Sequence, residues 1–438
     1  MKRIITWIMT ALAFVVVPVM AVAADISLFG TAMDVSLSGF GTIGYTVSDQ
    51  KFNYQRFIDN KGTLRRDSIF GAQVDVKLNN EFSVTVQGKV APSMDSDTGV
   101  DPALTWAFLS WRPTNDWLIR AGRIRAPFYL NSQNMEIGAT YDFARMPWEV
   151  YNAAQTNDGD GLMVRKSWNV DDNEFAVDAY FATAESSYRY YVRDSIPVAG
   201  LQSGSHFGKL KYTGGGISLS LQRGDDRYRM GVAKGTVRSN DMASPVTYPF
   251  VTLGPGVGYY QTTNLLPGPG VPSVQETRVM MYSAGADVGI GYDFRVMGEY
   301  VLCNTSNTDT SPSFQSAYLA VLRPIDKWVP YVSLAGIRSL QKNRDLYNKV
   351  NNTTVPGIIP NAAVINAAQR AGADGIYAYD QYTVALGTSY QINPHHKVKA
   401  EWARTQTGDM SSAIDAQPGG ESGHKVINVF SFSYNFVF

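Results

Sequence analysis

Aromatic and polar side chains alternate strictly along the last stretch of the chain, residues 426–438. Every second position carries an aromatic ring, at Phe430, Phe432, Tyr434, Phe436 and Phe438. Ser431, Ser433 and Asn435 lie between them. Successive side chains of a strand point to opposite faces, so this stretch predicts a strand with one aromatic face. A final strand of this kind is typical of a membrane barrel whose outside is lipid, and we expect Phe438 to act as an assembly signal.

The same alternation recurs along the whole chain, with charges confined to one face of each predicted strand. A strand tilted by about 40° climbs about 2.5 Å per residue, so an apolar band about 25 Å tall takes roughly ten residues. The predicted strands have about this length. Their charged face is therefore expected to line a lumen, and its clearest members are Lys89, Arg295, Glu299, Lys399 and Glu401.

Short and long connections alternate between these strands. The short ones consist of Gly, Pro, Asn or Asp, as tight turns do. They are predicted at 79–81, 112–116, 169–173, 213–216, 289–293, 323–327 and 393–396. The longest connections are the fifth, at about 224–275, and the seventh, at 340–375, and both are expected to be exposed. This rhythm predicts an all-β fold, a closed antiparallel transmembrane β-barrel of about sixteen strands with both termini on the side of the short turns.

The start of the chain predicts export. Lys2 and Arg3 precede an apolar run over 4–20, and small residues follow at 21–23. This is the pattern of a signal peptide cleaved after Ala23, which leaves residues 24–438 as the barrel domain. No later stretch reaches the roughly 18 apolar residues of a membrane helix. We therefore expect the mature protein in the outer membrane of a Gram-negative cell, surrounded by outer-membrane lipid.

Composition supports this class and excludes others. The chain has 39 Gly, 25 Tyr and 20 Phe, and its mean hydropathy is slightly negative although 45% of its residues are hydrophobic. Apolar residues are thus spread along alternating strands rather than pooled in a core. Basic and acidic residues balance at 38 each, so no nucleic-acid partner is indicated. The single cysteine, Cys303, rules out an intramolecular disulfide.

The third long connection, residues 126–160, is predicted to shape a narrow part of the pore. The preceding strand carries Arg120, Arg123 and Arg125, whereas the acidic connection itself contains Arg145. Its principal carboxylates are Glu136, Asp142 and Glu149. Opposed charges across a narrow opening would create a transverse field that filters solutes. In the alternative, the arginines only pair with the carboxylates and hold the loop in place.

Strand alternation adds a prediction about the three arginines. Arg123 and Arg125 should share one face, with Ile124 and Arg120 on the other. We expect Arg123 and Arg125 to face the lumen and Ile124 to face lipid or another subunit.

At this point the chain resembles the outer-membrane porins of Gram-negative bacteria over its whole mature length. The resemblance rests on Phe438, the sixteen-strand rhythm and the segment 121–128, Ala-Gly-Arg-Ile-Arg-Ala-Pro-Phe. Its Gly-Arg-x-x-x-Pro-Phe pattern is similar to that of phosphate-selective and related porins, in which the loop after the fifth strand folds into the barrel. No clear ladder of arginines is visible in the sequence. The resemblance implies a homotrimeric, water-filled channel for small hydrophilic solutes or ions, with an eyelet shaped by the third loop.

Other functions have weaker support in the sequence. A barrel enzyme such as a lipase or protease would need a histidine with a Ser or Asp partner, and only His206 and His424 are expected near the outer rim. A plugged adhesin or receptor barrel is suggested only by the long fifth and seventh connections. The oxygen-bearing residues at 95–101 lack a distal Glu, so an exposed turn is favoured over a cation site. We therefore predict no enzyme activity, no cofactor and no metal.

Overall fold

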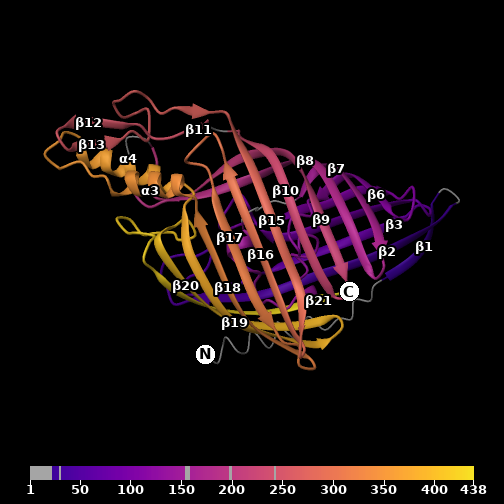
Figure 1. Ribbon diagram of the computed structural model, residues 1–438. Coiled ribbons are helices and arrows are strands. Elements are labelled where there is room, and N and C mark those ends of the chain that lie inside the picture. The colour runs from indigo at the N-terminus through magenta and orange to yellow at the C-terminus, as the bar shows by residue number, and fades with distance from the viewer. Residues whose placement is uncertain (1–21, 29–30, 153–157, 197–199, 241–242) are drawn as a thin grey trace.

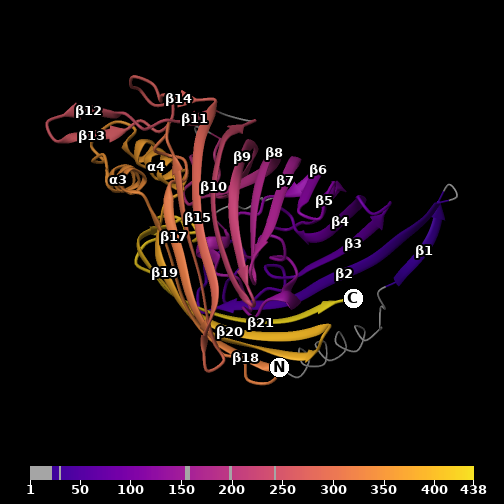
Figure 2. The ribbon, with the colours of Figure 1, turned by 45° about the vertical axis from the view of Figure 1, so that its right-hand side comes forward.

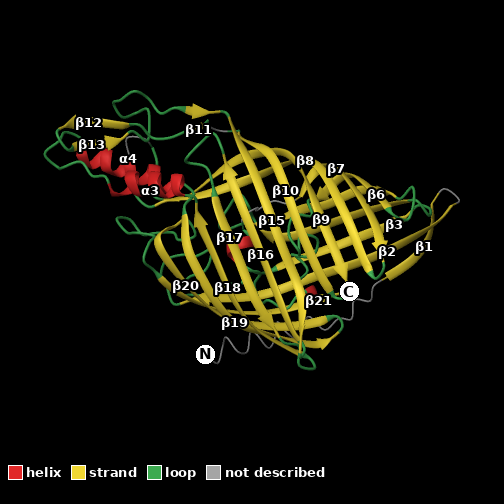
Figure 3. Ribbon diagram, viewed as in Figure 1, coloured by secondary structure: helices red, strands yellow, loops and turns green. Residues whose placement is uncertain are grey.

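The computed structural model describes residues 22–28, 31–152, 158–196, 200–240 and 243–438. Sixteen antiparallel strands form one closed barrel, as the alternation predicts (Figures 1 and 3). The barrel closes at β2 (Thr31–Ser48), which pairs with β3 (Ile69–Lys77) along one edge and with β21 (Val426–Val437) along the other. Closure leaves no bare strand edge toward lipid, where each unpaired polar group would cost several kcal/mol.

The remaining barrel strands follow in chain order and alternate in direction. They are β4 (Phe82–Pro92), β5 (Val100–Trp111), β6 (Trp117–Arg125), β7 (Asp158–Val170), β8 (Asn173–Val192), β9 (Gly204–Arg223), β10 (Asp226–Ser239), β15 (Glu276–Gly291), β16 (Phe294–Thr305), β17 (Phe314–Leu322), β18 (Trp328–Ser339), β19 (Tyr379–Asn393) and β20 (His396–Ser411).

The two faces of the barrel wall differ as predicted. In β21, Phe430 and Phe432 are more than half exposed on the outside, whereas Ser433 and Asn435 are 3% and 1% exposed. Tryptophans mark the short-turn end of the outer surface, at Trp111, Trp117, Trp168 and Trp328. The outer face thus carries the apolar band and aromatic girdle of a strand wall in lipid.

The final strand is fitted to the first barrel strand by two small residues. Gly39 and Phe438 exchange backbone hydrogen bonds of 2.9 and 3.0 Å. A side-chain carbon at Gly39 would lie 2.2 Å from the Phe438 ring, and one at Gly41 would lie 2.5 Å from the Phe436 ring. The terminal aromatic rings therefore cover glycines of β2, and the closure of the barrel depends on this fit.

One predicted turn is wrong, and with it the start of the fifth connection. Residues 213–216 lie inside β9, and β10 occupies the start of the predicted loop, which begins only at 240. The three glycines permit close strand contact: a side-chain carbon at Gly215 would lie 2.3 Å from the Tyr180 carbonyl oxygen, and one at Gly216 2.5 Å from that of Val232. The predicted count of sixteen strands is still right, because the prediction split β9 into two strands and missed β10.

The long connections build an ordered cap beyond one end of the barrel (Figures 1 and 2). Its elements are α3 (Gln341–Asn352), α4 (Ala362–Asp374), β11 (Ser244–Pro245), β12 (Phe250–Gly254), β13 (Val257–Tyr260) and β14 (Ser273–Val274). Helix α3 buries Leu346, Tyr347 and Val350, which share one helical face. Among the described residues, no helix has the length and apolarity to cross a membrane.

The predicted signal peptide, residues 1–23, lies almost entirely outside the described residues. The described chain begins with β1 (Val22–Leu28), which pairs with residues 31–37 of β2. The predicted cleavage point after Ala23 would fall inside this strand, and it stays a prediction.

Candidate functional site: the third loop and the inner wall

The third loop, residues 126–157, ends three residues earlier than expected because Asp158 already pairs with Arg125 as the start of β7. Its described part contains η1 (Gly138–Thr140) and α2 (Trp148–Tyr151). The loop is attached to β6 and β7, but it contacts strands that come much later in the chain, among them β16 and β20. The Leu130 amide donates to Glu299 of β16 at 2.9 Å, and Lys399 of β20 donates to the Phe143 carbonyl at 2.9 Å.

Aromatic packing reinforces these bonds. Phe143 is 1% exposed and packs edge-on against Tyr331 of β18 and Tyr318 of β17, with ring centroids 5.1 and 6.0 Å apart. Gly138 comes so close to the wall that a side-chain carbon there would lie 2.0 Å from Oδ1 of Asn435 in β21. The loop therefore packs against the inner faces of these strands, opposite the faces that carry the lipid-facing residues.

Arg125 and Glu136 form the anchor at the root of the loop. Arg125, with a side chain 2% exposed, binds Glu136 at 2.8 Å and Asp158 at 2.6 Å, and Lys89 of β4 also contacts Glu136. Burial alone would raise the pKa of Glu136, but Arg125 and Lys89 outweigh it and hold the pKa below its ordinary value of 4.5. These contacts match the alternative in which an arginine holds the loop.

The other predicted loop charges are also held by partners. Asp142 accepts hydrogen bonds from Lys397 at 3.0 Å and Ser389 at 2.7 Å. Arg145 lies 3.4 Å from Asp67 of the first loop and also binds Gln55. Burial raises the pKa of Asp67, but Arg145 and Arg66 more than offset this and lower it.

Glu149 completes the set of held loop charges. It is 2% exposed and accepts hydrogen bonds from Gln381 and Thr383 of β19. Each predicted loop charge thus serves to fix the loop's position.

The predicted phase of β6 is wrong at Arg123. Arg120 pairs in register with Ser110, which is 3% exposed. Arg123 instead donates to the carbonyl of Leu104, whose side chain faces outward, and to Asp160, whose side chain is 71% exposed. Ile124 is not turned toward lipid: it is 1% exposed and packs with Phe108 and Met163. The structure therefore places Arg120 on the inner face and Arg123 on the outer face.

The predicted lumen-facing residues share the inner face but differ in exposure. Glu299 and Lys399 are 5% and 2% exposed beneath the third loop, and Glu401 accepts a hydrogen bond from Tyr331 at 2.7 Å. Lys89 also binds the loop, as described above. Arg295 is instead paired with Asp287 at 2.8 Å, and its side chain is 26% exposed. Strand alternation places these residues on the inner face, but it does not contain their contacts with the third loop.

Two inner-wall arginines were missed. Arg165 of β7 forms a two-pronged ion pair with Asp178 of β8, at 2.8 and 2.9 Å. Arg229 of β10 donates to the carbonyl of Tyr129 in the third loop at 2.8 Å. Register places Arg165 and Asp178 directly opposite one another, so the alternation of β7 was the pattern that would have revealed the pair.

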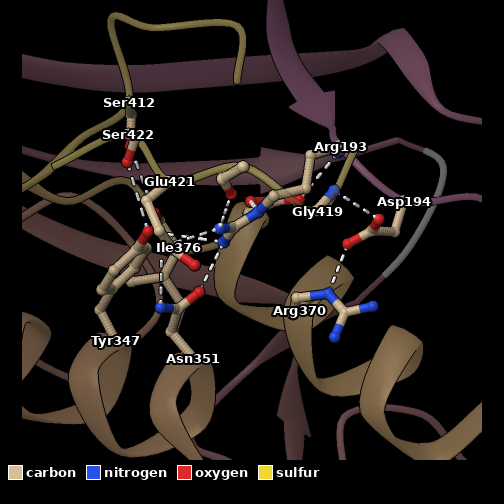
Figure 4. Close-up of polar contacts among 12 residues, drawn as sticks. Arg193, Asp194, Tyr347, Asn351, Arg370, Ile376, Ser412, Gly419, Glu421 and Ser422 are labelled. Carbon is tan, nitrogen blue, oxygen red and sulfur yellow. Dashed lines mark hydrogen bonds and ion pairs between the residues drawn. The ribbon is translucent and has the colours of Figure 1, made fainter. Parts of the chain in front are cut away.

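The cap is fastened by a buried arginine, shown in Figure 4. The Arg193 side chain is 1% exposed and lies in the fourth loop. It binds Asp374 of α4 at 2.8 Å, Asn351 of α3 at 2.7 Å and the Gly420 carbonyl of the eighth loop at 3.0 Å. Arg370 and Asp194 form a second pair beside it. These contacts tie three loops into one unit.

The two histidines that were expected near the outer rim have different polar neighbours. His424 lies 3.8 Å from Asp409, both well exposed, while the Ser422 hydroxyl lies near Tyr347 and the Ser411 amide. His206 contacts the Gln202 carbonyl and stacks on Tyr190. Within the described ranges, no group of three potential metal-binding side chains comes together.

Comparison with known proteins shows the fold class. No protein-family model matches the chain, and no curated protein matches it in sequence. Among solved structures, OmpF of Salmonella typhi in complex with daunomycin is 14% identical, with a TM-score of 0.50, over 95% of this chain and 100% of that one. The sixteen-stranded barrel is the fold of outer-membrane porins.

Two further solved structures resemble the barrel. An anion-selective porin from Comamonas acidovorans is 12% identical with a TM-score of 0.48, over 93% of this chain and 100% of that one. OprB of Pseudomonas putida is also 12% identical, with a TM-score of 0.49 over 93% and 94% of the two chains. At these identities the likeness is one of fold.

Proposed function

We propose that this protein is an outer-membrane channel through which small hydrophilic solutes or ions diffuse passively, with the lumen constricted by the third loop. The observation that carries the proposal is the anchoring of that loop, attached at β6 and β7, to inner-face residues of β16–β21. A segment that crosses from one side of a barrel to the other narrows any path between them. Polar and charged residues on the same inner face would hydrate the remaining opening.

The proposal includes location and assembly. The apolar outer band fits outer-membrane lipid, with the short turns in the periplasm and the cap outside the cell. We further propose a homotrimer and a role for Phe438 in assembly, because its ring covers Gly39 at the barrel closure. An enzyme or a plugged receptor barrel is less favoured. His424 and Asp409 are well exposed while the Ser422 hydroxyl contacts Tyr347 and the Ser411 amide, and inner-wall charges remain partly open.

Reconstitution into planar lipid bilayers tests the channel directly. Purified, folded protein should produce stepwise current increases that are linear with voltage, whereas the heat-unfolded sample should produce none. Folded protein that inserts but gives no current steps would contradict the proposal and favour a plugged barrel.

Epitope insertion tests the orientation with a matched pair of sites. Gly256, in the β12–β13 turn, has no atom near enough to obstruct an added side chain. A tag there should be labelled on intact cells, and a tag at the short turn near Asn393 should be labelled only after the outer membrane is opened. Labelling of the second tag alone would invert the topology.

A further inference from the structure

We infer that the inner wall formed by β6–β10 carries a binding site for small carboxylate-bearing solutes, centred on Arg120, Arg165 and Arg229. This inference rests on the proposed channel function and specifies a class of solute for it. The three arginines come from β6, β7 and β10, and each is partly exposed. They would bind a carboxylate of a solute that passes the third loop.

The wall already contains one carboxylate that is bound by an arginine through two parallel hydrogen bonds. Asp178 is 0% exposed and receives two parallel hydrogen bonds from Arg165, at 2.8 and 2.9 Å. Such pairing of a guanidinium with a carboxylate is strong and geometrically specific. The Arg165 side chain stays 35% exposed beside this pair.

Arg120 and Arg229 flank the pair without carboxylate partners of their own. Among the described residues, the buried Nε of Arg120 has no hydrogen-bond partner, and its guanidinium lies 4.8 Å from the centre of the Phe108 ring. Among the hydrogen bonds of the described residues, Arg229 donates to the backbone carbonyls of Pro127 and Tyr129. Both arginines lie within electrostatic range of Arg165. In the described part of the chain, Asp178 is the carboxylate that bonds directly to this cluster of three guanidinium groups, through Arg165.

The root of the third loop fixes Arg229 near the constriction. Ser218 donates to the Pro127 carbonyl at 2.8 Å, and Ser283 donates to the Phe128 carbonyl at 3.0 Å. These bonds hold the segment whose Tyr129 carbonyl orients Arg229. The cluster therefore lies directly beside the loop that narrows the lumen.

The excess of positive charge continues along the wall. Arg227 and Arg295 share one carboxylate, Asp287, with distances of 2.8 Å to each. Two further carboxylates lie near the cluster: Asp75, which accepts hydrogen bonds from Thr85 and Gln73, and Glu299, which accepts one from the Leu130 amide. Five arginines thus face four carboxylates, Asp75, Asp178, Asp287 and Glu299, and this excess of positive charge favours anions at this wall.

The chemistry of the cluster selects the ligand class. Guanidinium groups present paired N–H donors that match the two oxygens of a carboxylate, as Arg165 shows with Asp178. Among the described residues, the guanidinium N–H groups of Arg120 and Arg229 bind no carboxylate. A small dicarboxylate is therefore a suitable probe, because its two ends can engage both.

Succinate tests the inference in the same bilayers that test the channel. Potassium chloride current through the wild type should fall as succinate is added. The half-inhibiting succinate concentration should rise about tenfold in an Arg120→Gln/Arg229→Gln double variant, equivalent to about 1.4 kcal/mol. Arg123→Gln is the matched control, since Arg123 lies on the outer face, and it should keep the wild-type response.

Arg120→Gln alone provides a second variant, because Arg120 has no contact with the third loop among the bonds described above. It should raise the half-inhibiting concentration by about threefold, a fraction of the tenfold effect. Wild-type current that is unaffected by succinate, or equal inhibition in wild type and both variants, would overturn the site but leave the channel intact. Absence of any current would instead overturn the channel function itself.

Discussion

The two sides of the inner wall use their charges differently. On β16–β21, Glu299, Lys397 and Lys399 are almost fully buried and bind the third loop. On β6–β10, neither Arg120 nor Arg229 forms an ion pair with a carboxylate in the described part of the chain, and Arg165 stays partly exposed. The first side thus holds the third loop, and in the proposed channel the second side would be available to solutes. The comparison teaches that conductance and charge selectivity should depend on separate groups of residues.

The largest effect should come from Arg125→Ala, which removes the anchor at the root of the loop. Two carboxylates, Glu136 and Asp158, would lose a partner whose side chain is 2% exposed. Loss of one member of a buried ion pair costs about 3–5 kcal/mol. The loop should loosen, which raises single-channel conductance and current noise. Arg123→Ala should leave both at wild-type values, and a quiet, unchanged Arg125→Ala channel would show that the loop is held without this anchor.

A smaller effect is expected from Arg165→Ala on the open side. The substitution removes one positive charge and leaves Asp178 without its Arg165 partner, so the excess of positive charge at the wall falls by one. The anion-to-cation permeability ratio should fall by roughly threefold at low salt, since a charge lining a narrow opening changes the local ion concentration. The shift should shrink at high salt, where the Debye length falls below about 10 Å. A ratio that does not respond at any salt concentration would contradict an open, solute-facing wall.

The pH dependence should be the mildest effect and should belong to the anchored loop. Because the pKa of folded Glu136 lies below 4.5, its ion pairs stabilise the loop fully above that pH and lose strength as pH falls through the lower, folded pKa. Conductance and noise should therefore rise only below about pH 4.5. Glu136→Gln should remove this component of the pH response. A wild-type channel that loosens on alkalinisation would have the opposite sign.

Strand alternation was sufficient to predict the barrel and the orientation of most strands. Lys399 and Glu401, for example, were placed on the inner face because the residues between them are apolar. The prediction failed where small residues serve contacts between strands: the glycines at 214–216 resemble a turn in sequence, yet they admit neighbouring backbone. Such close approach depends on partners distant in the chain, which alternation within one strand does not contain.

The candidate site was predictable in its position but not in its roles. The length and charge of the third loop indicated a constriction, and the alternative that Arg125 holds the loop agrees with its contacts. The phase of Arg123 was wrong because Ile124 was assigned to lipid from its hydrophobicity, although it packs on Phe108 and Met163. Arg229 was missed because its importance comes from the Tyr129 carbonyl, which folding brings to it.

The central claim is that the two sides of the wall control different properties, and a pair of single substitutions tests it most directly. Lys399→Met removes the bond to the Phe143 carbonyl on the anchored side, and Arg120→Gln removes a charge on the open side. Conductance and reversal potential would be measured for both in a tenfold gradient of potassium chloride. We expect higher conductance with little change in reversal potential for Lys399→Met, and a shift toward cations with little change in conductance for Arg120→Gln. The same change in both variants, or the two effects exchanged, would contradict it.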